Sequence, residues 1–119
     1  MATKTLTMLA VGDLILDEPQ AESYFAHVAS LLKSADVVVG QVEVVFTDRG
    51  FCASTDVAAP PCDPANMSAI PFAGFNVITL AGNHVWDSGP AGIEDTIAGL
   101  QSYGIAVVGA GMNIDAKDL

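Results

Sequence analysis

The chain alternates between short apolar runs and longer segments whose apolar residues recur every three or four positions. Runs of the first kind predict buried strands, and segments of the second kind predict helices with one apolar face. The predicted strands are Thr5–Val11, Asp36–Gly40, Asn76–Leu80 and Ile105–Val108. The predicted helices are Glu18–Ser34, Pro64–Ala73 with Asp63 as its N-cap, and Gly89–Tyr103. Residues 44–64, which contain several prolines, predict mainly a loop.

This order of elements indicates an α/β fold with a mostly parallel sheet flanked by helices. Asp36–Gly40 is apolar throughout its centre, as strands covered on both faces are. Three helices cover only part of such a sheet, and the sequence stops where Asn113 or Asp115 would open a further helix. We therefore expect residues 1–119 to be a single segment of a larger domain, on which more chain or a partner packs.

Composition narrows the class of protein. A hydrophobic content of 51% excludes global disorder. The formal net charge of -10, from 14 acidic and four basic residues, argues against binding to nucleic acid or to anionic lipid. No apolar run approaches the ~18 residues that a membrane span needs. The first residues lack the pattern of a secretory signal, so the sequence predicts a cytoplasmic protein, in which Cys52 and Cys62 would more often stay reduced than pair.

Polar side chains follow the predicted strands. Asp13 comes after the first strand, Glu43 after the second, and Asn83, His84 and Asp87 after the third. Because the carboxyl ends of parallel strands meet at one edge of a sheet, we expect these side chains to converge. Carboxylate and amide oxygens together with an imidazole suit a divalent metal such as Mg, Mn, Fe or Zn. Such an ion also offsets the repulsion between neighbouring carboxylates.

Each of these residues also has a structural interpretation. Asp13 is typical of a turn or an N-cap, and Glu43 of the solvent face of an extended strand. Asn83 and His84 fit a turn that enters a helix. Asp87 either caps the next helix or orients His84 by accepting a hydrogen bond from it. What favours a site is the joint placement of these residues at strand ends.

Arg49 is one of the four basic residues of the chain. It either pairs with Asp48 or Glu43, or binds an anionic group of a substrate with its planar guanidinium. The second alternative makes Arg49 a candidate substrate-binding residue.

Motifs spread over nearly the whole chain, in order, together resemble one family. They are Val11–Asp13, Ala35–Glu43, Gly74–His84, Asp87–Gly89 and Gly109–Asn113. The stretch Gly-Phe-Asn-Val…Gly-Asn-His…Asp-Ser-Gly is the most specific part. The combination resembles the CapA family, which is named for poly-γ-glutamate capsule synthesis and belongs to the calcineurin-like metallophosphatase superfamily.

The resemblance implies that the chain is the N-terminal portion of a two-sheet α/β sandwich with one or two divalent ions at the strand ends. By motif, Asp13, Glu43 and Asn83 would be metal ligands, and His84 would be catalytic, near the leaving group. Similar enzymes attack a phosphoester, or another ester or amide, with a metal-bound hydroxide. Ile15 and Gln41 depart from the pattern, because related chains carry histidine and asparagine there. Later histidine ligands are absent from these 119 residues.

Three functions remain open at this stage. The first is a metal-dependent hydrolase with a small anionic or polymeric substrate. The second is a non-catalytic protein of poly-γ-glutamate synthesis or capsule assembly. The third is one fragment of a cleaved hydrolase, completed by a missing C-terminal segment or a second chain.

Overall fold

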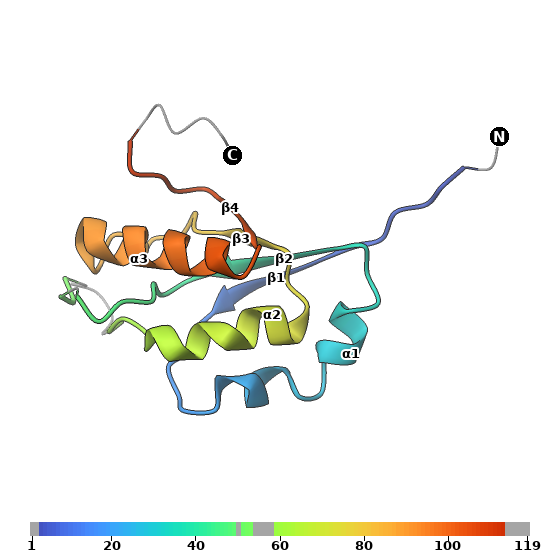
Figure 1. The fold of residues 1–119 in the computed structure, drawn as a ribbon, viewed down its shortest axis with the longest axis horizontal. Helices are drawn as coiled ribbons and strands as arrows, with labels where there is room; N and C mark the ends of the chain where they lie inside the picture. Colours follow the sequence, from blue (N-terminus) through green and yellow to red (C-terminus); the bar gives the residue numbers. More distant parts are fainter. Residues whose placement is uncertain (1–2, 50, 54–58, 114–119) are drawn as a thin grey trace.

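The computed structural model describes residues 3–49, 51–53 and 59–113, which form an all-parallel sheet and the helices that connect its strands (Figure 1). The four strands of this part lie in the order β1-β2-β3-β4. Their bounds are β1 Met8–Leu14, β2 Val37–Val42, β3 Val77–Thr79 and β4 Ala106–Val108. The helices are η1 Ala21–Phe25, α1 Ala29–Leu32, η2 Pro64–Ser68, α2 Ala69–Ala73 and α3 Gly89–Ser102. The predicted α/β class and parallel sheet are confirmed.

The segment predicted as one helix over Glu18–Ser34 is broken, and that prediction is wrong in its continuity. It forms the 3₁₀ helix η1 and the single turn α1, which are separated by turn residues 26–28. Its buried residues are nevertheless Ala21, Phe25, Ala29 and Leu32, the spacing of one helical face. Other apolar residues of the same segment, Tyr24, Val28 and Leu31, are exposed, so only part of the predicted apolar face packs on the core.

The second predicted helix divides in a similar way, into η2 followed by α2. Its start agrees with the prediction, because the side chain of Asp63 accepts a hydrogen bond from the backbone N–H of Ala65 at 2.8 Å. A carboxylate at this position satisfies one of the backbone donors that the first turn leaves without a partner.

β1 and β2 run further toward their carboxyl ends than the sequence predicts. β1 passes through Gly12 and Asp13 to Leu14, although Gly-Asp is a turn signal. Val11 pairs with Gly40 and Leu14 with Val42, so β1 carries one extra residue there, which is a β-bulge. Pairing with the neighbouring strand overrides the local preference for a turn.

The main core lies on one face of the sheet, and Figure 1 shows α1 and α2 running below β1 and β2. Residues of β2 alternate between buried and half-buried, so its second face is only partly covered in the described residues. On the core face, Gly40 leaves room for three side chains. A Cβ at Gly40 would lie 2.7 Å from Leu14, 2.9 Å from Ile78 and 3.0 Å from Phe75.

The segment predicted mainly as loop contributes strongly to the core at its beginning. Residues 44–47 are all buried, and Phe46 forms an isolated parallel bridge with Cys62. The hydroxyl of Thr96 accepts the N–H of Phe46 at 2.8 Å, and the carbonyl of Gly92 lies 2.7 Å from the same hydroxyl. These hydrogen bonds anchor the irregular segment to α3.

Two further predictions concern the cysteines and the chain end. Cys52 is exposed and Cys62 is buried, and both are free thiols. Burial raises the pKa of Cys62 to about 11. Asn113 lies in a bend, and Asp115 lies outside the described residues.

Among the described residues, we find no helix whose length and apolar character would allow it to cross a membrane.

Candidate functional site

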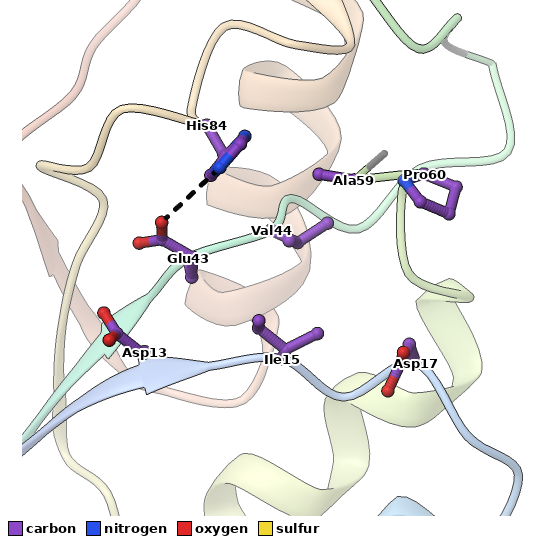
Figure 2. Close-up of a pocket in the computed structure, with 8 residues that line it drawn as sticks. All are labelled: Asp13, Ile15, Asp17, Glu43, Val44, Ala59, Pro60 and His84. Atoms are coloured by element: carbon purple, nitrogen blue, oxygen red, sulfur yellow. Dashed lines mark ion pairs between the residues drawn. The ribbon is translucent and has the colours of Figure 1, made fainter. Parts of the chain in front are cut away.

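An open cavity of about 270 Å³ lies beyond the carboxyl ends of β1 and β2 (Figure 2). It is lined by Asp13, Ile15, Asp17, Glu43, Val44, Ala59, Pro60 and His84. Three of the predicted site residues therefore line the same cavity: Asp13 from β1, Glu43 just after β2, and His84 after β3. Parallel connections between neighbouring strands bring these distant segments to a common edge.

Asp17 also lines the cavity, and the sequence analysis missed it. Leu14 and Leu16 are buried, whereas Asp13, Ile15 and Asp17 alternate with them on the cavity side. This is the period of two that extended backbone imposes on its side chains, and it was visible in the sequence. Asp17 accepts a hydrogen bond from the hydroxyl of a neighbouring tyrosine at 3.1 Å.

His84 is held between two carboxylates. Its Nδ1 donates to Oδ2 of Asp87 at 2.6 Å, and its Nε2 lies 3.9 Å from Oε1 of Glu43 (Figure 2). The side chains of His84, Glu43 and Asp87 are only 12%, 14% and 16% exposed. An ionised carboxylate only accepts hydrogen bonds, so the contact with Asp87 places a proton on Nδ1 and directs Nε2 toward Glu43.

Gln41 is a second residue whose part in the site the sequence did not reveal. Its Oε1 accepts the backbone N–H of Asp13 at 2.8 Å, and its Nε2 donates to Oε2 of Glu43 at 2.8 Å. The only signal in the sequence was that the family resemblance leads one to expect asparagine rather than glutamine at position 41. Its side chain thus contacts both acidic residues of the predicted site.

Two predicted site residues are not among those that line the cavity. Asn83 is exposed, and it is not among the residues that line the cavity. Arg49 lies along a different groove, where its guanidinium donates to Asp95 at 3.0 and 3.1 Å and to Glu94 at 2.8 Å. Hydrogen bonds from Arg49 and then Thr47 lower the pKa of Asp95, and those carboxylates raise the pKa of Arg49. The structure does not bring Arg49 to the cavity.

The donor types of the cavity fit a divalent ion. Carboxylate oxygens from Asp13 and Glu43 and an imidazole nitrogen from His84 are ligands typical of Mn, Fe and Zn sites. Within residues 3–49, 51–53 and 59–113, however, no three side chains of His, Cys, Asp or Glu gather closely enough to hold an ion together. The described residues therefore offer donors whose chemistry suits an ion, but no group of three that lie close enough together to hold one.

Residues 7–118 match the model of a family described as bacterial capsule synthesis protein PGA_cap. The chain is 32% identical to "Capsule biosynthesis protein CapA" of Bacillus anthracis over 96% of its own length and 31% of that protein. It is 25% identical to "PGA biosynthesis protein CapA" of Bacillus subtilis, over 90% of the chain and 31% of that protein. A Mycobacterium tuberculosis protein named "Probable polyglutamine synthesis accessory protein" is 33% identical over 68% of the chain and 21% of its own length.

The chain thus spans less than a third of the length of these curated relatives. The family match nevertheless covers almost all of it, in agreement with the motifs at the strand ends. The chain belongs to the PGA_cap family of bacterial capsule synthesis proteins.

Proposed function

We propose that the full chain takes part in making a polyglutamate-type capsule as a metal-dependent hydrolase of a phosphoester, or of another ester or amide. One observation carries the proposal. Asp13, Glu43 and His84 come from three separate strand ends and line one cavity. The names of the relatives, which concern capsule and polyglutamine synthesis, support the biological setting.

In this proposal the two carboxylates of Asp13 and Glu43 bind a divalent ion, and the rest of its coordination comes from groups beyond those described. When bound, the ion would polarise a substrate oxygen and offset the negative charge of the two carboxylates.

His84 moves the proton. With Nδ1 held by Asp87, its Nε2 is directed toward Glu43 and the cavity, where it can protonate a leaving oxygen or accept a proton from the attacking group. Ile15 and Val44 supply the apolar part of the cavity wall.

The test is metal content and hydrolysis in the full chain. We expect added Mn²⁺ to support hydrolysis of a generic phosphodiester or ester, and Asp13→Asn and His84→Ala each to lower the rate by about 10²-fold or more. Asp48→Asn is the matched control, because Asp48 is an exposed carboxylate that does not line this cavity. If no metal supports activity, and metal content is the same in Asp13→Asn and the unaltered chain, the hydrolase proposal fails.

A non-catalytic role in polymer assembly is the second candidate. The name of the mycobacterial relative, which describes an accessory protein, favours it. With a net charge of -10, the chain repels a polyanion unless a cation bridges the two. Polyglutamate pull-down with and without EDTA separates the candidates. Binding that EDTA abolishes, in a chain that hydrolyses nothing, would favour assembly over hydrolysis.

A further inference from the structure

The bulge in β1 leaves one backbone donor near the cavity without a ladder partner. Asp13 adopts a φ of 54°, a left-handed conformation that is uncommon for residues other than glycine, asparagine and aspartate. Its N–H donates to the side chain of Gln41 rather than to a strand carbonyl. Strained residues of this kind persist where their surroundings hold them in place.

The hydrogen bonds of Gln41 determine the orientation of its amide. Oε1 faces the N–H of Asp13, which is a donor, while Nε2 faces Oε2 of Glu43 and the carbonyl of Val42 at 3.1 Å, which are acceptors. Turning the amide over would oppose oxygen to oxygen and N–H to N–H, so only one orientation satisfies the three contacts. A half-buried side chain with these bonds forms a rigid link between β1 and Glu43.

The loop after β3 closes over this link. A Cβ on Gly82 would lie only 2.6 Å from Nε2 of Gln41 and 3.1 Å from Oε2 of Glu43. Glycine at this position therefore lets the loop that carries His84 pass directly over the Gln41–Glu43 pair.

We propose that Gln41 is a positioning residue for the cavity: it holds the bulged backbone of Asp13 and the carboxylate of Glu43 in a fixed relation. This inference rests on the proposed function, because the two acidic residues are the ion-binding groups of that proposal. Gln41 itself acts through them.

The test compares Gln41→Met with Asn76→Leu in the full chain. Gln41→Met keeps an unbranched side chain of similar length but removes all three hydrogen bonds of the amide. Asn76 is a matched control at the opposite end of the strands, where its amide accepts the N–H of Val38 at 2.9 Å and donates to the carbonyl of Asp36 at 3.3 Å. Two quantities are measured: hydrogen exchange of the Asp13 amide by NMR, and Mn²⁺ affinity by electron paramagnetic resonance titration.

We expect Gln41→Met to exchange the Asp13 amide about tenfold faster and to bind Mn²⁺ about 10–100-fold more weakly. Asn76→Leu should leave both quantities unchanged, even where it lowers the unfolding temperature. If the unaltered chain binds Mn²⁺ and Gln41→Met binds it equally well, the role of Gln41 is refuted but the proposed function is not. An unchanged exchange rate of the Asp13 amide in Gln41→Met has the same consequence. Absence of Mn²⁺ binding by the unaltered chain overturns the proposed function, and the role of Gln41 with it.

If circular dichroism shows that Gln41→Met does not fold, Gly82→Ala decides the question. It retains the glutamine but displaces its amide, so weaker Mn²⁺ binding is again expected. Unchanged affinity in this variant also overturns the inference.

Discussion

Replacing Gly82 with alanine is the sharpest single perturbation of the packing beneath the candidate site. The new Cβ would stand 2.6 Å from Nε2 of Gln41, about 1 Å closer than an ordinary non-bonded contact allows. Gly82 does not have a positive φ, so the backbone itself accepts alanine. Without the close contact, the substitution would stabilise the fold by about 0.4–1 kcal/mol, because alanine leaves the unfolded chain with less conformational entropy than glycine does.

The close contact makes the substitution destabilising instead. Gln41 must withdraw its Nε2, which breaks the 2.8 Å hydrogen bond to the carboxylate of Glu43. A hydrogen bond to a charged group contributes about 1.5–3 kcal/mol. Subtracting the gain from the unfolded state leaves a net destabilisation of about 0.5–2.6 kcal/mol for Gly82→Ala.

The assay is urea unfolding of the full chain, with Gly12→Ala as the matched control. A Cβ on Gly12 meets nothing closer than Oε1 of Gln41 at 4.0 Å, and Gly12 also lacks a positive φ. Gly12→Ala should therefore match or slightly exceed the unaltered chain in unfolding free energy. If Gly82→Ala is as stable as Gly12→Ala, the close approach of the loop to Gln41 is refuted.

Three other predictions follow from contacts outside the cavity. Thr96→Val should lower the unfolding free energy by about 1–3 kcal/mol, because it leaves a buried backbone N–H unsatisfied; Thr96→Ser should restore most of the loss in the same urea assay. Arg49 lowers the pKa of Asp95 in the folded state. The ionised Asp95 therefore stabilises the fold at pH values above the ordinary carboxyl pKa of about 3.9, and this stabilisation is lost as the pH falls through the lower pKa of the folded state. Asp95→Asn should therefore flatten the loss of unfolding free energy between about pH 5 and pH 2, and an identical acid slope would contradict this. Because burial raises the pKa of Cys62 to about 11, a thiol reagent at neutral pH should label Cys52 at once and Cys62 only on unfolding, whereas equal labelling rates would refute its protection.

The local pattern of apolar and polar residues was sufficient to predict the order of strands and helices. Alternation of apolar runs with helical spacing predicted the α/β class, and the N-cap at Asp63 was recognisable because its hydrogen bond reaches only two residues along the chain. Asp13, Glu43 and His84 could be placed at one edge of the sheet only by assuming that neighbouring strands run parallel, which brings their carboxyl ends together.

The sequence also contained information that we did not use. Asp13, Ile15 and Asp17 alternate with buried leucines, so the cavity position of Asp17 follows from the period of two in an extended segment. By contrast, the helical spacing over Glu18–Ser34 included not only Ala21 and Phe25, which are buried, but also Tyr24, Val28 and Leu31, which are exposed.

By itself, then, the sequence determined the succession of strands and helices and the chemical types of the groups at the strand ends, because these depend on neighbours a few positions apart. Tertiary structure alone decided the bulge at Asp13, the link through Gln41 and the pairing of Arg49 with Asp95. These features depend on hydrogen bonds between residues 28 and 46 positions apart. Such contacts exist only once the strands have paired and α3 has packed, and no local preference of either partner specifies them.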